Sequence, residues 1–213
     1  MYKRGESGVD LVDIFPKTIA VAQLKSLTPT VISQARELLD KTCTYQIKGD
    51  GGFTTEQQLL NRELFRDVKA EILGLCSEFA AAHNHILEGL HICNSWGNIV
   101  HHGDGIRYHK HSNSYISGAF YLSDGCPFNI LNDGYADIFG GFLPSRRKEE
   151  NFRDMESFTI NPKIGRIIIF PASLKHCVIT SSSNEARYSI AFNAIPKGRI
   201  GDPTGLMEIP ITE

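Results

Sequence analysis

Three histidines and one arginine lie in segments whose other residues are apolar enough to form buried strands. His109 and His111 are separated by one residue, His176 opens a later segment, and Arg187 follows eleven residues after it. Neutral imidazoles bind transition metals, and a guanidinium binds carboxylates through a planar fork of N–H groups. This combination predicts a metal ion together with a small anionic cosubstrate.

The segment from Arg187 to Asn193 would have two unlike faces if it forms a strand. Residues two apart project from the same side, so Arg187 and Ser189 would share a face with Ala191 and Asn193. The opposite face carries Tyr188, Ile190 and Phe192. Because a buried guanidinium without a partner is strongly unfavourable, we expect Arg187 and Ser189 to bind a dicarboxylate. An internal Arg–Asp pair, or a reversed strand, is the alternative.

His109 and His111 would share one face of a short strand, with Lys110 on the other. If they converge with His176, three nitrogens become available for iron, zinc, copper or nickel. Single histidines are more often core or surface residues than ligands. The prediction therefore depends on the combination and order of the three.

Hydrophobic periodicity indicates two helices in the first third of the chain. Thr28 is suited to be the N-cap of a helix that begins at Pro29. Its apolar stripe consists of Val31, Ala35, Leu38 and Leu39. A second helix is predicted from about Glu56 or Asn61 to His83. Its apolar residues recur at intervals of three and four: Leu64, Val68, Ile72, Leu75 and Phe79.

Short strand-like segments separated by turn sequences follow from Leu87 onward. Eight are candidate strands: 90–101, 107–109, 117–122, 128–131, 158–160, 166–170, 176–180 and 186–194. An additional strand is expected within Asp10 to Leu24. The pattern predicts a mainly β fold, a double-stranded β-helix (the jelly roll of cupin-like proteins), buttressed by the two N-terminal helices.

Residues 1–213 are expected to form a single domain. Residues 1–86 would supply the N-terminal strand and supporting helices, residues 87–195 the jelly-roll core, and residues 196–213 a C-terminal tail. The segment from Tyr135 to Ser157 is long for a loop inside a compact domain. It is interpreted either as a lid over the barrel mouth or as a disordered segment.

Composition excludes several classes of partner. With a formal net charge of −2 and a pI near 6.4, the chain has no field that would attract nucleic acid or an anionic membrane. No apolar run approaches the roughly 20 residues of a membrane helix. The five cysteines form no CxxC pair and no signal peptide is recognised, so we expect reduced thiols and a cytoplasmic location. Nothing in the sequence indicates the oligomeric state.

The order of the candidate residues resembles that of the non-haem Fe(II) and 2-oxoglutarate-dependent oxygenases. These enzymes have an HxD/E motif, a distal histidine and then an RxS pair on the following strand. Here the matching features are His109-x-His111, His176 and Arg187-x-Ser189. A bacterial and phage-borne subgroup is more similar still, through Trp96-Gly97-Asn98, Ser117-Gly118-Ala119-Phe120-Tyr121-Leu122, Phe170-Pro171 and Asn193. The resemblance extends over about Asp10 to Ala194.

The resemblance implies roles for these residues. His109 and His176 would be iron ligands, and Arg187 with Ser189 would hold the far carboxylate of 2-oxoglutarate. Trp96, Asn98 and Tyr121 could line the cosubstrate pocket, and the alternative is that they are core aromatics and a strand amide without such a role. One position departs from the pattern, because the usual third ligand is a carboxylate and the matching residue is His111. A site of three histidines could still hold Fe(II), but it would be less anionic.

Other residues could complete the iron site instead of His111. A literal HxD sequence occurs at His102-Gly103-Asp104, in a glycine-flanked turn seven residues before His109. Asp133, in an Asn-Asp-Gly turn, could also supply a carboxylate, and water could fill the position if His111 turns away.

The resemblance predicts an Fe(II)- and 2-oxoglutarate-dependent dioxygenase that uses O2 and releases succinate and CO2. The expected outcome is hydroxylation of a peptidyl side chain or a small molecule. One alternative is a cupin-like three-histidine metalloenzyme without 2-oxoglutarate, which would not need Arg187 and Ser189. Another is a barrel that binds a ligand without catalysis, since one jelly roll serves many functions.

Overall fold

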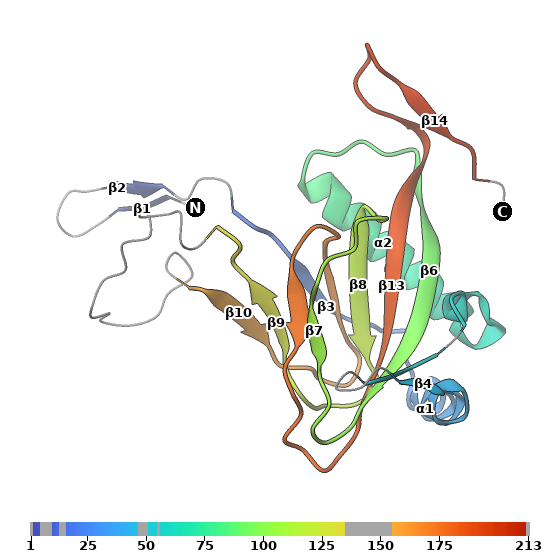
Figure 1. Cartoon of the computed structure of the whole chain (residues 1–213). Coiled ribbons are helices and arrows are strands. Elements are labelled where there is room, and N and C mark those ends of the chain that lie inside the picture. The colour runs from blue at the N-terminus through green and yellow to red at the C-terminus, as the bar shows by residue number, and fades with distance from the viewer. Residues whose placement is uncertain are drawn as a thin grey trace.

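Two antiparallel β-sheets form the body of the structure (Figure 1). The computed structural model describes residues 2–4, 10–12, 16–46, 51–54, 56–134 and 155–211. Within these ranges, no helix has the length and apolar character needed to cross a membrane.

The larger sheet contains the longest strands of the fold. Its order is β3 (Ala20–Gln23), β11 (Arg166–Pro171), β8 (Ile116–Tyr121), β13 (Arg187–Ile200), β6 (Gly89–Val100), β5 (Gly52–Phe53) and β4 (Tyr45–Gln46), and β14 (Met207–Ile209) pairs with β13. The smaller sheet has the order β10 (Ser157–Ile160), β9 (Phe128–Leu131), β12 (His176–Val178) and β7 (Ile106–His109). A separate hairpin joins β1 (Tyr2–Arg4) to β2 (Asp10–Val12). The predicted double-stranded β-helix is thus confirmed.

Two helices cover the outer face of the larger sheet, as predicted. The first, α1 (Pro29–Thr42), is capped by Thr28, whose side chain accepts a hydrogen bond from the main-chain N–H of Val31 at 3.3 Å. It approaches β6 closely, because a Cβ added at Gly97 would lie 2.1 Å from Leu39 Cδ2. The second, α2 (Arg66–Ala82), runs behind β8, β13 and β6 in Figure 1.

The second helix begins later than either predicted start. Residues before it form two 3₁₀ turns, η1 (Leu59–Asn61) and η2 (Glu63–Phe65), separated by the extended backbone of Arg62. Ser95 of β6 ties this segment to the sheet, since its side chain accepts a hydrogen bond from Leu60 N at 2.9 Å. The apolar residues there are therefore buried without being α-helical.

The strands of the larger sheet alternate as period-two geometry requires. The apolar face of β13, formed by Tyr188, Ile190 and Phe192, belongs to the core cluster that includes Leu39 of α1 and Ile72 of α2. The opposite face carries Arg187, Ser189, Ala191 and Asn193 and is directed between the two sheets. The predicted division of this strand into two faces is correct, and the reversed-strand alternative is wrong.

The predicted C-terminal tail is partly β-strand. The strand predicted to end at Ala194 continues to Ile200 and pairs with β14, so residues 196–213 are not an extended tail throughout. The strand has a register shift between Asn193 and Ala194, and Pro196 and Gly198 follow. Because these features interrupt the strand pattern, the sequence does not predict the continuation. Residues 135–154 of the proposed lid lie outside the described residues.

Candidate metal centre

Three histidines lie close together between the two sheets, two of them on strands and one just after a strand. His109 of β7 and His176 of β12 are register partners, so their side chains project from the same face. Their ring centroids lie 4.3 Å apart. His111 follows the end of β7, where its main-chain N–H donates to Ala172 O at 2.9 Å. This contact brings its ring to 5.1 Å from that of His109 and 5.3 Å from that of His176.

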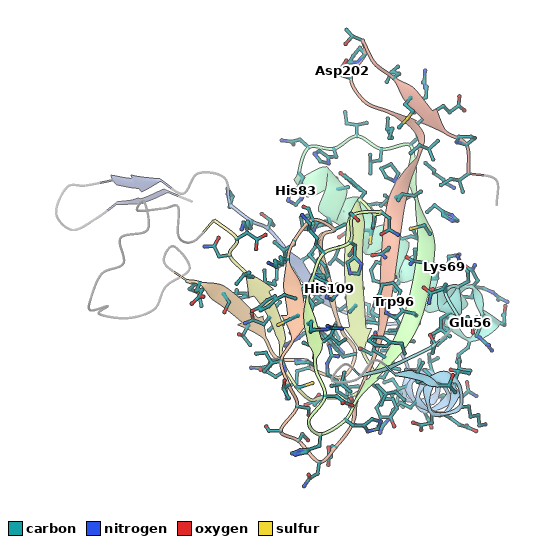
Figure 2. The ribbon with its side chains drawn as sticks, viewed as in Figure 1. Glu56, Lys69, His83, Trp96, His109 and Asp202 are labelled. Carbon is teal, nitrogen blue, oxygen red and sulfur yellow. The ribbon has the colours of Figure 1, made fainter. Side chains whose placement is uncertain are left out.

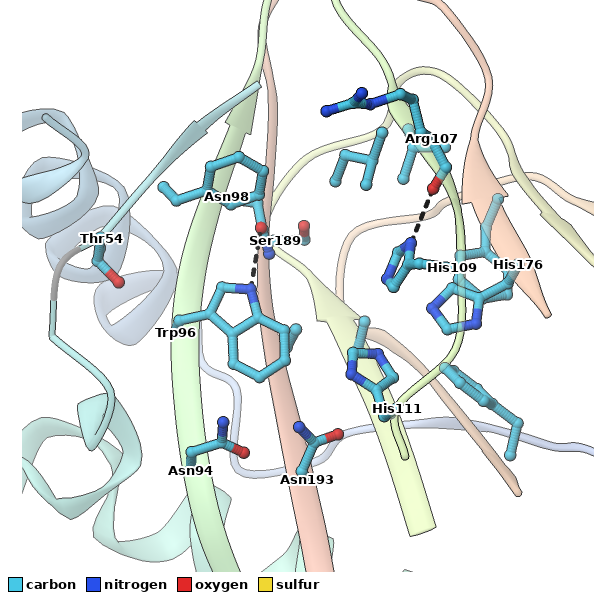
Figure 3. A pocket seen from close by; sticks show the side chains of 18 of the residues that line it. Thr54, Asn94, Trp96, Asn98, Arg107, His109, His111, His176, Ser189 and Asn193 are labelled. Carbon is cyan, nitrogen blue, oxygen red and sulfur yellow. Dashed lines mark hydrogen bonds between the residues drawn. The ribbon is translucent and has the colours of Figure 1, made fainter. Parts of the chain in front are cut away.

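The nitrogens of the three rings are close enough to share one ion. One ligand atom from each residue lies within 4.8 Å of the others. Two nitrogens bound at about 2.1 Å to one ion in tetrahedral or octahedral geometry lie roughly 3.0–3.4 Å apart, so the widest pair would need to close by up to about 1.8 Å when an ion binds. Figure 2 places His109 near the middle of the molecule, and Figure 3 shows the three rings together on one side of the cavity.

Hydrogen bonds fix two of the rings in a tautomer suited to metal binding. His109 Nδ1 lies 2.8 Å from Arg107 O, and His176 Nδ1 lies 2.8 Å from Leu174 O. Because a carbonyl oxygen can only accept, each Nδ1 carries the proton. Nε2 of each ring is therefore left with a free lone pair, the arrangement that metal-binding histidines usually have.

Burial keeps the rings of His176 and His111 neutral. It lowers the pKa of His176 to about 3, despite the opposing effect of the Leu174 carbonyl. Burial, with the nearby His109, also lowers the pKa of His111 to about 4. Both rings therefore present lone pairs rather than protons near neutral pH, as a cation site requires.

The histidines line a cavity of about 860 Å³ that also contains the predicted arginine and serine. Arg187 is 2% exposed and Ser189 is 1% exposed. Arg187 Nη1 donates to Ser189 Oγ at 3.3 Å, whereas Arg187 Nε has no hydrogen-bond partner. No ion pair joins Arg187 to a carboxylate in the part of the chain that the structure describes, so the predicted alternative of an internal Arg–Asp pair is not found there.

A second unsatisfied polar group lies beside Arg187. The guanidinium carbon is 4.9 Å from the ring centroid of Tyr121, and the Tyr121 hydroxyl is buried without a partner. Burial raises the pKa of Tyr121, so the hydroxyl keeps its proton and can donate. Of these two groups, Arg187 lines the cavity, and its free Nε can donate to an anionic ligand there. Tyr121 itself lies behind the cavity wall and is not among the lining residues.

Asn98 lies on the same wall as Ser189, its register partner across β6 and β13. Its Oδ1 accepts a hydrogen bond from Trp96 Nε1 at 3.2 Å (Figure 3). Asn98 is 4% exposed and lines the cavity together with Trp96. Both residues therefore line the same cavity as Arg187 and Ser189.

The structure does not bring the alternative carboxylates to the histidines. His102 and Asp104 lie in the turn between β6 and β7, and Asp133 is exposed in the turn after β9. Among the described residues, the group of side chains able to hold a metal ion consists of His109, His111 and His176. The literal HxD sequence is therefore part of a turn, and His111 faces the other two histidines.

Several residues that line the cavity or lie directly behind its wall were not assigned a role from the sequence. Asn94 and Ser117 lie on the inner faces of β6 and β8, where they flank Asn193 of β13. Their positions follow the alternation of Trp96 and Tyr121, so period-two reasoning could have identified them. Thr54 and Gln57 come from an irregular segment that has no such periodic signal.

The central part of the chain matches one family model. Residues 94–193 match the family described as "Putative 2OG-Fe(II) oxygenase", which confirms the resemblance noted in the sequence. No curated protein sequence matches the chain.

Solved structures share the fold at low sequence identity. The epimerase SnoN from nogalamycin biosynthesis is 13% identical, with a TM-score of 0.60 over 84% of this chain and 78% of its own. HygX from Streptomyces hygroscopicus, solved with nickel, 2-oxoglutarate and hygromycin B, is 14% identical, with a TM-score of 0.57 over 84% and 83%. A Pseudomonas putida prolyl-4-hydroxylase is 14% identical, with a TM-score of 0.56 over 83% and 92%.

Proposed function

Because residues 94–193 match the 2OG-Fe(II) oxygenase family, we propose that this chain is an Fe(II)- and 2-oxoglutarate-dependent dioxygenase that hydroxylates a peptidyl or small-molecule substrate. O2 would be consumed, and succinate and CO2 released. The observation that carries the proposal is the buried Arg187, whose Nε lacks a partner, in the same cavity as the three-histidine cluster.

In this proposal, His109, His111 and His176 hold the iron. Bound Fe(II) would supply the activation of O2 that is coupled to oxidative decarboxylation of 2-oxoglutarate. The Nδ1 hydrogen bonds of His109 and His176 keep the opposite nitrogens directed at the ion. Three protein ligands leave coordination positions for the cosubstrate and O2.

Arg187 and Ser189 would bind the far carboxylate of 2-oxoglutarate. A guanidinium and a hydroxyl form charge-assisted hydrogen bonds with a carboxylate, and this would satisfy the free Nε. Phe128 and Phe170 pack against His176, with ring centroids at 5.0 and 4.8 Å. These apolar rings exclude water from one side of the centre, which strengthens electrostatic interactions there.

Hydroxylation is proposed over other oxidations because it requires no further acid or base from the protein. In the described lining of the cavity there is no carboxylate that could act in such a role. The proteins with similar folds include an epimerase and a carbocyclase as well as a prolyl-4-hydroxylase, so the fold does not decide this point.

We also propose that residues 1–213 work as one domain, with the helices of residues 1–86 supporting the jelly roll. All five cysteines are free thiols, as expected of the proposed cytoplasmic location.

Turnover of 2-oxoglutarate tests the proposed function. The protein incubated with Fe(II), ascorbate, 2-oxoglutarate and O2 should form succinate, measured by mass spectrometry, even at the slow rate expected without substrate. His176→Ala should abolish this reaction, whereas His102→Ala, in the exposed turn, should leave it unchanged. Absence of succinate under conditions in which metal is bound would favour the three-histidine alternative without 2-oxoglutarate.

A further inference from the structure

The cavity has a second polar end, built around two asparagines that the proposed metal centre does not use. Asn193 of β13 and Asn94 of β6 are register partners, so their amides lie side by side. Asn193 lies six positions after Arg187, so their Cα atoms are roughly 20 Å apart along an extended strand. That distance is several times the length of a five-carbon diacid, so the asparagines lie beyond its reach.

Trp96 separates the two ends of the cavity. Its indole is held by the bond to Asn98, and its ring centroid lies 5.8 Å from that of His111. In Figure 3, Asn98 and Ser189 lie on one side of Trp96, and Asn94 and Asn193 lie on the other. His111 lies beside Trp96, and all three histidines line the same cavity as the asparagines, so a molecule held by the asparagines would share the cavity with the metal centre.

A hydrogen bond from the neighbouring strand β8 fixes the orientation of the Asn193 amide. Ser117 Oγ donates to Asn193 Oδ1 at 2.6 Å, and both residues are 1% exposed. Asn193 Nδ2 has no hydrogen-bond acceptor within the described chain and lies on the cavity wall. An amide whose oxygen is already bonded, and whose N–H groups stand on a cavity wall without a protein acceptor, can donate to a bound ligand.

Asn94 complements this donor. Its Oδ1 has only a weak contact with Cys93 Sγ at 3.9 Å, so it retains the capacity to accept a hydrogen bond. The pair thus presents N–H donors from Asn193 next to an acceptor from Asn94. A planar carboxamide, with its own carbonyl and N–H, matches this pattern and fits beside the flat ring of Trp96.

The positive charges of the cavity disfavour a cationic ligand, and the neutral asparagines give an anionic ligand no counter-charge in this compartment. Its charged lining residues, in the ranges that the structure covers, are Arg107 and Arg187, and no carboxylate is present to neutralise a cationic amine. The amides themselves offer an anion no full charge. We propose that this compartment binds the substrate through an uncharged carboxamide of the peptide type, an inference that rests on the proposed function.

Trp96 provides a direct reporter for the test, because it is the only tryptophan in the chain. The full-length protein would be titrated with N-acetylalanine N-methylamide, which is neutral and carries two amide groups. Matched probes would be N-acetylalanine (an anion), alanine N-methylamide (a cation) and erythritol (a neutral polyol). We expect saturable quenching or enhancement of fluorescence with the neutral amide at concentrations at least tenfold lower than with the other three.

Two variants connect the signal to the asparagine. Asn193→Asp keeps the shape and the acceptor for Ser117 but removes the N–H donors, and it should weaken binding of the neutral amide by about tenfold. Asn184→Asp makes the same charge change at an exposed turn and should have no effect. Equal binding by wild type and Asn193→Asp, tighter binding of erythritol or of a charged probe, or no saturable response would overturn the inference.

Titrations of the same samples with Ni(II) and 2-oxoglutarate distinguish this inference from the proposed function. If both bind and the neutral amide does not, the carboxamide compartment is wrong and the proposed function stands. If the neutral amide binds in an Asn193-dependent manner and neither Ni(II) nor 2-oxoglutarate does, the compartment stands and the proposed function falls.

Discussion

His109 and His176 are register partners across the β7–β12 ladder, and the two rings are fixed in the same way. Each Nδ1 donates to the main-chain carbonyl two residues earlier, at 2.8 Å. The pair is therefore oriented before any ion arrives, and little side-chain freedom is lost on binding. No such bond is found for the ring of His111 among the described residues, so the backbone contact with Ala172 and the packing of neighbouring rings position it.

Loss of one of these histidines should remove metal binding. His176→Ala is expected to weaken Ni(II) or Fe(II) affinity by more than the roughly 10–100-fold typical of losing an outer-shell partner. Isothermal titration calorimetry of the apo protein would measure this. His102→Ala is the control and should bind metal normally. A comparable loss in His102→Ala would instead point to the turn that contains the literal HxD sequence.

His111→Asp should change the charge of the site without removing a ligand. Three neutral imidazoles leave the ion's two positive charges to be balanced by 2-oxoglutarate, so metal and cosubstrate should each increase the other's affinity. A carboxylate at position 111 should tighten metal binding without 2-oxoglutarate by about tenfold and reduce this mutual effect. Affinities measured with and without 2-oxoglutarate would reveal both changes.

His111→Asn is the matched control, since it has the shape of aspartate without its charge. It should lose metal affinity and keep the fold. If both variants fail to fold, His111 has a packing role instead, and the assignment of a third ligand is wrong.

Arg187→Met should separate cosubstrate binding from metal binding. We expect 2-oxoglutarate affinity to fall by about 10–100-fold, because a charge-assisted pair is lost, while Ni(II) affinity is retained. The apo protein should be as stable as wild type or more so, since a buried guanidinium with an unpaired Nε is replaced by an apolar chain of similar length. Equal losses of metal and 2-oxoglutarate affinity would contradict the proposal that Arg187 binds the far carboxylate of 2-oxoglutarate.

Acid should destabilise the apo protein through the buried histidines. Folding lowers the pKa of His176 to about 3 and that of His111 to about 4, below the ordinary value near 6.5, so the unfolded chain binds more protons in this window. Stability is therefore complete above about pH 6.5 and falls as the pH decreases toward 3. For the buried His176 the slope is up to roughly 1.4 kcal/mol per pH unit.

Denaturant unfolding at several pH values would measure this slope. His176→Gln cannot take up the proton and should give a flatter dependence than wild type. If the free energy of unfolding falls equally steeply with decreasing pH in wild type and in His176→Gln, burial of His176 does not govern the acid response.

Period-two geometry explains why much of the site could be predicted. Arg187 and Ser189 share a face because they lie two apart on one strand, and the alternation also places Asn193 on that face. The Thr28 cap similarly fixed the start of α1. Local patterns of this kind depend on neighbours in sequence, so they are visible without the fold.

Features set by distant contacts could not be predicted. The turns at residues 59–65 are extended and 3₁₀ because Ser95 of β6 binds Leu60, and no local pattern contains that information. The position of His111 depends on Ala172, which is sixty-one residues away. The pairing of Asn94 with Asn193 likewise needs the register of β6 and β13.

The most direct test of the whole account is an anaerobic titration of the protein with Fe(II) and then with 2-oxoglutarate. Chelation of iron by the 2-oxo acid gives a weak visible charge-transfer band. We expect this band in wild type, its absence in His176→Ala, and a requirement for much more 2-oxoglutarate in Arg187→Met. A protein that binds Fe(II) normally but develops no band at any 2-oxoglutarate concentration would contradict it.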